Sequence, residues 1–120
     1  MEFQFKKDIP DLEKRKEQFK ILQTKHPKKI PIILEKDPLS KFEGIQKTRH
    51  LINKDFTVSK FQLMIKKLLK LPEEEEALFL SAKGKYNITG EKTIEEIYKT
   101  YKDKQDGFLY IMYSSEIVYG

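Results

Sequence analysis

An amphipathic helix in the middle of the chain constrains the fold more than any other feature of the sequence. Thr57 is suited to cap its N-terminus, and the helix is expected to stop near Pro72. Between them, apolar residues recur at spacings of three and four: Val58, Phe61, Met64, Ile65, Leu68 and Leu69. Such a helix buries one face only, so it needs a second layer to pack on. The short apolar runs on both sides of it predict that this layer is a β-sheet.

Four runs of the chain have the composition of β-strands. They are residues 30–35, 48–53, 77–81 and 108–113. A second capped helix begins at Thr93, which forms a capping box with Glu96. The order strand, strand, helix, strand, short helix, strand is typical of the β-grasp, a mixed sheet wrapped over one helix. We therefore predict an α+β protein of the β-grasp (ubiquitin-like) type with a four-stranded sheet.

Two extra helices are expected before this pattern. Phe19 and Leu22 belong to an apolar stripe, and Pro27 disfavours helix at the residue before it, which predicts a helix over residues 10–25. Residues 2–8 are expected to form a separate short helix. A chain of 120 residues has room for one domain with a modest core. We divide that domain into an N-terminal helical extension (1–26), a β-grasp core (27–113) and a tail (114–120).

The residue types argue against enzymatic chemistry. The chain has no Cys, which excludes disulfides, thiolate metal sites and a cysteine nucleophile. His26 precedes a proline and His50 lies in a strand candidate with no acidic cluster nearby in sequence. The run Glu73–Glu76 fits a solvated turn, because consecutive acids around a turn point in different directions. We therefore predict no catalytic residues, no metal and no cofactor.

Hydropathy and charge limit where the chain acts and what it binds. No apolar run approaches the ~20 residues of a membrane helix, and the N-terminus lacks the apolar stretch of a signal peptide, so cytoplasm is expected. The formal net charge is +5 at pH 7, and basic residues concentrate in the first two thirds of the chain. A basic surface attracts acidic peptides, anionic lipids or nucleic acid without distinguishing them, and it can also be merely a solvated surface.

The sequence ends in Gly120, a short distance after the last predicted strand. Glycine has no Cβ to hinder its α-carboxylate. A final strand followed by an extended tail ending in Gly is therefore suited to conjugation through that carboxyl group.

The chain resembles the autophagy ubiquitin-like modifiers, which include the GABA-receptor-associated protein and microtubule-associated protein light chain 3 groups. The resemblance covers nearly all of the sequence. Its landmarks are Phe3, 10–15 (PDLEKR), 26–36 (HPKKIPIILEK), Leu51-Ile52, 56–61 (FTVSKF), 77–79 (ALF), 106–114 (DGFLYIMYS) and Gly120.

The resemblance implies that the strand at residues 48–53 accepts a partner's aromatic-x-x-aliphatic motif as an added strand. The first pocket, for the aromatic residue, would be lined by Gln18, Leu22, Pro31, Ile33, Lys47, Arg49, Leu51 and Phe108. The second pocket, for the aliphatic residue, would be lined by His50, Ile52, Asn53, Phe56, Phe61, Met64 and Leu68. Lys47 and Arg49 would also meet acidic residues that precede the aromatic.

The resemblance also implies a conjugation pathway. Activating and conjugating enzymes would transfer the Gly120 acyl group to phosphatidylethanolamine, and a cysteine protease would process and deconjugate the protein. The lipidated protein would mark autophagosome membranes and cytoplasmic vesicles and recruit cargo receptors and adaptors, and no nucleic acid partner is expected. The alternative is a non-conjugated β-grasp module whose basic face binds acidic proteins, the cytoskeleton or nucleic acid.

Three positions of the second pocket depart from the family pattern. His50 replaces the usual Tyr or Phe, Asn53 replaces the usual Pro, and Leu68 stands where many members have Arg. We expect these changes to alter the shape of that pocket and its peptide preference.

Overall fold

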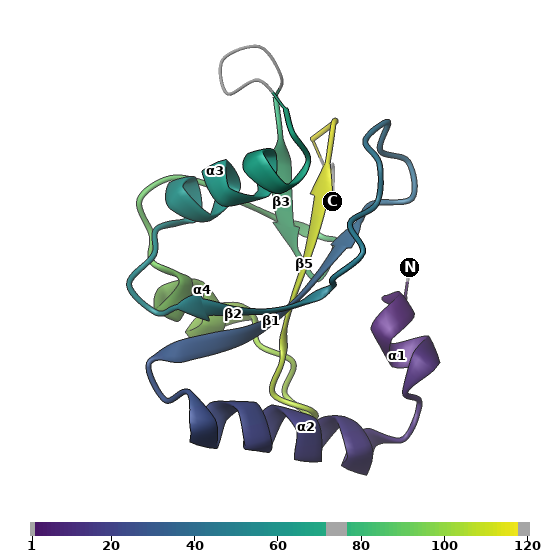
Figure 1. Cartoon of the computed structure of the whole chain (residues 1–120), viewed down its shortest axis with the longest axis vertical. Helices are drawn as coiled ribbons and strands as arrows, with labels where there is room; N and C mark the ends of the chain where they lie inside the picture. Colours follow the sequence, from purple (N-terminus) through teal and green to yellow (C-terminus); the bar gives the residue numbers. More distant parts are fainter. Residues whose placement is uncertain (1, 72–76, 118–120) are drawn as a thin grey trace.

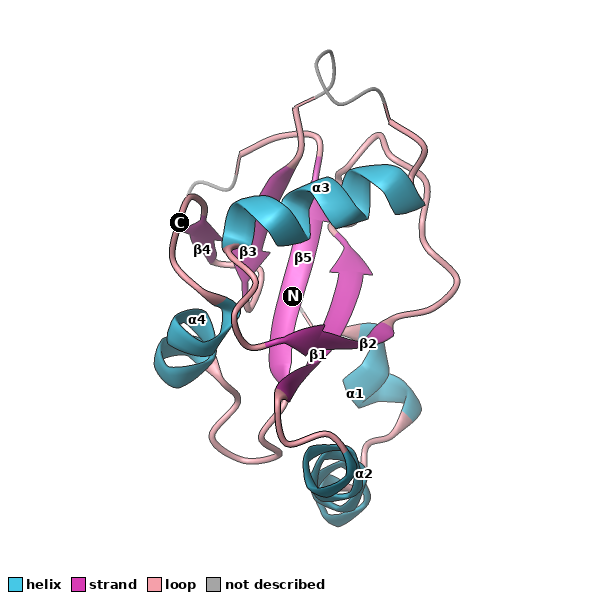
Figure 2. Ribbon diagram, turned by 60° about the vertical axis from the view of Figure 1, so that its left-hand side comes forward, coloured by secondary structure: helices cyan, strands magenta, loops and turns pink. Residues whose placement is uncertain are grey.

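A computed structural model describes residues 2–71 and 77–117 of the chain. Its helices are α1 (Gln4–Asp8), α2 (Leu12–Lys25), α3 (Val58–Leu68) and α4 (Ile94–Tyr101). Its strands are β1 (Lys29–Lys36), β2 (Arg49–Asn53), β3 (Phe79–Ala82), β4 (Tyr86–Ile88) and β5 (Leu109–Ser114). Figures 1 and 2 show one sheet, with α3 across one face and α2 beside the opposite face.

The strand order in the sheet is β2-β1-β5-β3-β4. The two central strands, β1 and β5, are parallel, with Ile32 opposite Leu109, and the other pairs are antiparallel. The predicted α+β class and the β-grasp arrangement are confirmed, because a mixed sheet holds α3 on one face. The outermost position of β2, next to β1 alone among the described strands, places the candidate binding strand at an edge of the sheet.

The sheet has five strands, so the predicted number of four was wrong. Residues 86–88, which lie outside the four predicted strands, form β4 and pair with β3. Lys83 and Gly84 both have positive φ values, of 59° and 72°, and they make the tight turn that reverses the chain. Because β4 is very short and buries only Ile88, it gives no detectable alternation of apolar residues.

Side chains on the two faces of the sheet form two cores. On the α3 face, Phe61 and Ile65 are fully buried against Ile32 and other sheet residues. On the opposite face, α1 and α2 contribute Phe3, Phe5 and Phe19 to a cluster with Ile33, Phe108, Tyr110 and Met112. The alternation of β1 thus supplies both cores, which explains why nearly the whole strand is apolar.

The α1 helix is anchored on the sheet by a carboxylate. Glu35 of β1 accepts hydrogen bonds from the backbone N–H groups of Gln4 (2.7 Å) and Phe5 (2.9 Å). These N–H groups lie in the first turn, where no other partner exists within the helix. Phe3 and Phe5 are 5% and 7% exposed and pack on the domain.

Candidate peptide-binding edge and its cavities

The backbone of β2 has hydrogen-bonding groups that point away from the sheet. The backbone N–H of Leu34 donates to the carbonyl of Thr48, and the backbone N–H of Lys54 donates to the carbonyl of Lys28. The backbone N–H and C=O groups of the even-numbered residues of β2 therefore face β1. In an antiparallel pair, residues alternate between those whose backbone groups bond to the neighbouring strand and those whose backbone groups point away from it. The N–H and C=O of Leu51, at the middle of β2, therefore point outward, where an added strand would pair with them.

The side chains of β2 alternate between the two faces of the sheet. Arg49 and Leu51 lie opposite Ile33 and Pro31, on the α2 face. His50 and Ile52 lie opposite Ile32 and Ile30, on the α3 face. A peptide that pairs with β2 could therefore direct its side chains to both the α2 face and the α3 face of the sheet.

A cavity of about 490 Å³, here called the edge cavity, lies along β2. It brings together six residues predicted for the first pocket: Leu22, Pro31, Lys47, Arg49, Leu51 and Phe108. It also contains His50, Ile52 and Met64, which were predicted for the second pocket, and Lys29 and Ile32, which were not predicted. The two predicted pockets are therefore continuous at this edge.

Two residues predicted for the first pocket do not line the edge cavity. Gln18 lies on α2, and its Oε1 accepts a hydrogen bond of 3.0 Å from Nη1 of Arg49. Gln18 therefore positions the guanidinium at the rim instead of forming the wall. Ile33 is fully buried in the core beneath α2, where it belongs to the aromatic cluster.

The structure also separates the residues predicted for the second pocket. Phe61 is fully buried in the core under α3. Phe56 is half-buried, with Nζ of Lys60 4.2 Å from the centre of its ring. Asn53 is exposed, and its Oδ1 accepts the backbone N–H of Asp55 (2.9 Å). These three side chains do not line the cavities found along β2.

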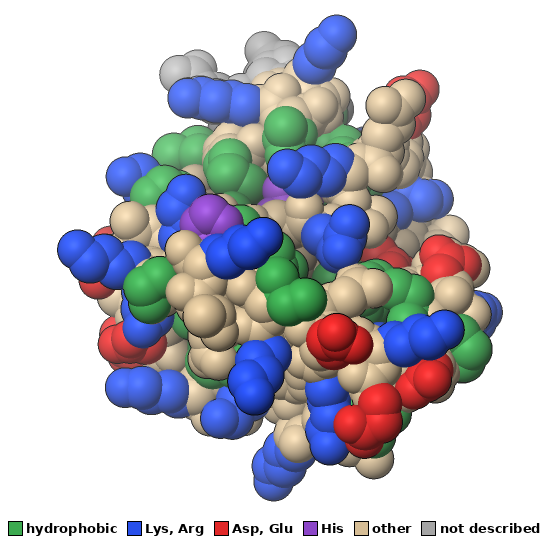
Figure 3. Space-filling view, turned by 60° about the horizontal axis from the view of Figure 1, so that its bottom comes forward, with side chains coloured by type: hydrophobic (Ala, Val, Ile, Leu, Met, Phe, Trp, Pro, Cys, Tyr) green, Lys and Arg blue, Asp and Glu red, His purple; other side chains and the backbone are tan. Residues whose placement is uncertain are grey.

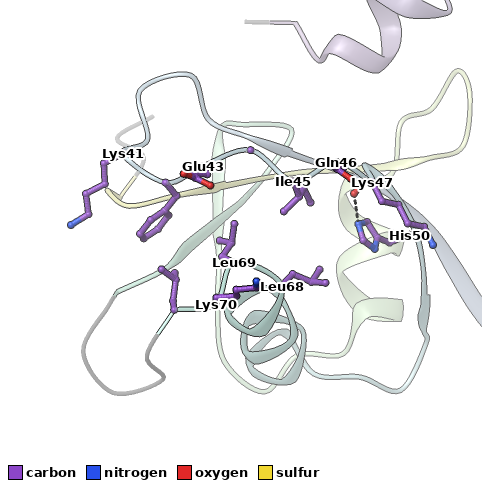
Figure 4. A pocket seen from close by; sticks show the side chains of 12 residues that line it. Lys41, Glu43, Ile45, Gln46, Lys47, His50, Leu68, Leu69 and Lys70 are labelled. Atoms are coloured by element: carbon purple, nitrogen blue, oxygen red, sulfur yellow. Dashed lines mark hydrogen bonds between the residues drawn. The ribbon is translucent and has the colours of Figure 1, made fainter.

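Leu68 and His50 instead line a second cavity, here called the loop groove, of about 780 Å³. It lies between the connection from β1 to β2 and the C-terminal end of α3, as Figure 4 shows. Lys47, predicted for the first pocket, also lines it, and the other lining residues were not predicted: Lys41, Phe42, Glu43, Gly44, Ile45, Gln46, Leu69, Lys70 and Leu71. Phe42 and Ile45, two apolar residues in a polar connection, were the available signal.

His50 forms part of the wall between the two cavities, since it lines both. Its Nε2–H donates a hydrogen bond of 2.8 Å to the carbonyl of Lys47 (Figure 4). Burial lowers the pKa of His50, the bond to the carbonyl raises it, and the charge of Lys47 lowers it, for a net pKa below 6.5. The ring is therefore neutral at pH 7. Its contribution to stability is present above about pH 6.5 and declines as the pH falls toward the folded-state pKa.

Lys and Arg side chains gather on the face of the molecule around α2, as Figure 3 shows. This face adjoins the edge cavity, which Lys29, Lys47 and Arg49 line. A potential of this sign speeds the approach of acidic ligands and disfavours basic ones.

The described residues were also expected to lack metal sites and membrane-spanning helices. Among these residues, no group of three or more His, Asp or Glu side chains is arranged to hold a metal ion. In the same part of the chain, no helix has both the length and the apolar character needed to cross a membrane. Gly120, Pro72 and the whole run Glu73–Glu76 lie outside the described residues.

A β-grasp core with helices added before it and an open edge strand defines a ubiquitin-like protein. Residues 13–120 match the model of a family described as "Autophagy protein Atg8 ubiquitin like". The chain belongs to this Atg8 family of ubiquitin-like autophagy proteins, as the sequence resemblance indicated.

Two relatives support this assignment over most of their length. The chain is 40% identical over 116 residues to "Autophagy-related protein 8" of Dictyostelium discoideum, which covers 97% of this chain and 93% of the relative. It is 40% identical over 110 residues to "Autophagy-related protein 8e" of Arabidopsis thaliana, covering 92% of this chain and 88% of the relative.

Proposed function

We propose that this protein is a non-enzymatic modifier that is conjugated to phosphatidylethanolamine through Gly120 and binds aromatic-x-x-aliphatic motifs along β2. One observation carries the binding part of the proposal. The backbone groups of β2 that point outward lie next to the edge cavity and the loop groove, and side chains of β2 line both cavities.

The spacing of the motif suits an edge with pockets on opposite sides. Successive residues of a strand point to opposite faces, so residues separated by three positions also do so. An aromatic residue directed toward Leu22 and Phe108 would therefore be followed by an aliphatic residue directed toward Ile52 and Met64. Three residues of strand span about 10 Å, and the edge cavity runs continuously between these two groups.

Acidic residues that precede the aromatic would meet Lys47 and Arg49 at the beginning of β2. Both side chains are exposed, so they contribute mainly to the rate of association and to selectivity. This basic rim favours receptors and adaptors whose motifs follow acidic residues.

The conjugation part of the proposal rests on family membership, since the family match extends to Gly120. A conjugating enzyme would hold the Gly120 acyl group as a thioester. The amine of phosphatidylethanolamine would attack the carbonyl carbon, forming an amide and releasing the enzyme thiol. The thiols belong to the pathway enzymes, including a deconjugating protease, because this chain has no Cys. Two acyl chains give stable anchoring where one is marginal.

This function places the protein in the cytoplasm before conjugation and on autophagosome and vesicle membranes afterwards. The basic face around α2 also suits the alternative of a non-conjugated module that binds acidic proteins, the cytoskeleton or nucleic acid (Figure 3). Steep salt dependence of binding to DNA or RNA would distinguish a nucleic-acid binder. We expect no such binding.

The double variant Arg49→Glu with Leu51→Ala tests the edge cavity. It reverses a rim charge and removes apolar surface next to the aromatic subsite, so we expect the Kd for an acidic aromatic-x-x-aliphatic peptide to rise by about 10 to 100-fold. Titration calorimetry measures the change. The single variant Lys85→Glu, on an exposed side chain beside the opposite edge of the sheet, serves as the charge control. Unchanged affinity in the double variant would count against the site.

A further inference from the structure

The loop groove is a preformed feature whose walls come from two separate parts of the chain. One wall is the connection from Lys41 to Lys47, and the other is Leu68, the last residue of α3, with the segment that follows it to Leu71 (Figure 4). Phe42, in the first wall, is only 8% exposed and packs in the main core. The groove is therefore formed on the core of the protein and does not depend on a bound partner.

Hydrogen bonds to the end of β5 hold the first wall in place. The Tyr113 hydroxyl donates to the carbonyl of Glu43 at 2.7 Å. Ser40 and Ser115 are joined by a bond of 3.2 Å from the Ser115 backbone N–H to the Ser40 hydroxyl. The backbone N–H of Lys41 donates in turn to the Ser115 hydroxyl at 3.0 Å. A wall fixed in this way is ready to bind a ligand without first losing conformational freedom.

The second wall combines an exposed apolar side chain with a cation. Leu68, which lines the groove, is 48% exposed. Lys70 follows the helix with a φ of 57°, a left-handed conformation that glycine adopts at lower cost. Lys70 and Lys47 form no ion pair with other described residues. Among the described residues that line the groove, Glu43 has the one acidic side chain, beside the basic Lys41, Lys47 and Lys70.

We propose that the loop groove accepts an apolar side chain from the acidic segment that precedes the aromatic residue of a bound peptide. The apolar side chain would contact Ile45, Leu68 and Leu69, and carboxylates on either side of it would meet Lys47 and Lys70. This inference rests on the proposed peptide binding along β2 and adds a third subsite to it.

The position of the groove determines which part of the peptide enters it. Lys47 and His50 line both the edge cavity and the loop groove, so the two cavities adjoin at the beginning of β2. Acidic residues that precede the aromatic lie at this same end in the proposed complex. The residues before the motif, and not those after it, therefore continue into the groove.

Three synthetic peptides test the proposal by titration calorimetry on the full chain. The first carries only an aromatic-x-x-aliphatic motif with one preceding Asp. The second adds the sequence Glu-Leu-Glu before that Asp, and the third adds the same residues after the motif. We expect the second peptide to bind about 10-fold more tightly than the first, because it buries one further leucine and pairs two further carboxylates. The third is expected to gain less than twofold.

Variants at the end of α3 separate the groove from general charge effects. Lys70→Glu is expected to remove most of the gain of the second peptide and to leave the first within twofold. Lys67→Glu makes the same charge change on an exposed residue outside the groove and is expected to preserve the gain. Lys70→Gly is expected to raise the thermal midpoint, since glycine suits the left-handed conformation, while still weakening the second peptide by about threefold.

The peptides also distinguish failure of this inference from failure of the proposed function. If the first peptide binds and neither extension improves it, or if the third gains as much as the second, the groove assignment is wrong and peptide binding at β2 stands. If none of the peptides binds the wild-type chain, both the groove and the proposed peptide site are overturned.

Discussion

A Gly120→Ala variant is expected to fold like the wild-type protein and to lose conjugation to phosphatidylethanolamine almost completely. The added methyl group crowds the carboxylate that the activating and conjugating enzymes must hold in narrow sites. Misplacing a reacting group by about 1 Å can slow a reaction by roughly 100-fold, and two successive enzymes handle this carboxylate. The fold is unaffected because the last strand ends at Ser114 and the described core lies before the tail.

Reconstitution with activating and conjugating enzymes and liposomes measures this loss. The product is detected by its shift in gel mobility and by flotation with the liposomes. Val118→Ala is the matched control, since it shortens one side chain of the same tail and keeps the terminal glycine. Normal conjugation of Gly120→Ala would show that Gly120 is not the acyl donor.

An Arg15→Met variant is expected to lower the free energy of unfolding by about 3–5 kcal/mol, because it leaves the buried Asp106 carboxylate without its positive partner. Nε of Arg15 lies 3.0 Å from Oδ2 of Asp106, and the two side chains are 8% and 0% exposed. The Arg15 guanidinium also donates to the carbonyls of Ile9 and Pro10, at 2.8 and 3.1 Å. The pair thus holds α2 and the α1–α2 connection against the segment that leads into β5.

The carboxylate that remains in this variant cannot be hydrated easily. Asp106 accepts hydrogen bonds from the hydroxyl of Tyr110 and the backbone N–H of Phe108. Burial, together with the Asp106 carboxylate as acceptor and as a negative charge, raises the pKa of Tyr110 well above its usual value. Tyr110 therefore stays protonated and continues to donate, but it does not supply the positive charge that is lost.

Chemical denaturation compares Arg15→Met with Lys54→Met. Lys54 forms an exposed ion pair with Glu95 at 3.7 Å, so its loss is expected to cost less than about 1 kcal/mol. Adding Asp106→Asn to Arg15→Met is expected to recover part of the lost stability, because the uncompensated charge is removed. Equal, small losses in both single variants would mean that the buried pair contributes no more than a surface pair.

The fold was largely predictable because its strongest signals are periodic. The spacing of Phe61 and Ile65 places them on one face of α3, and both are fully buried there. Thr93 and Glu96 form the predicted capping box. The short strand β4 was not predictable from a pattern, since it consists of Tyr86, Asn87 and Ile88 and depends on a turn in which Lys83 adopts a positive φ.

The candidate site was predictable only in part, because it depends on how separate segments meet. Sequence resemblance named Leu22, Leu51 and Phe108, and these three residues lie together at the edge cavity. The loop groove was missed because Phe42 and Ile45 come from an irregular connection, which has no period to read. Phe61 was predicted to line the second pocket, but it lies in the core, because its face of α3 packs on the sheet.

Hydrogen exchange at single backbone amides tests the central claim most directly, that partners add a strand to β2. The N–H of Leu51 points outward, whereas the N–H of Ile52 faces β1, so these neighbours differ in the free protein. Saturation with an aromatic-x-x-aliphatic peptide is predicted to slow exchange at Leu51 by more than about 10-fold and to change Ile52 far less. Unchanged exchange at Leu51, or slowing at the opposite edge strand β4 in its place, would contradict the account.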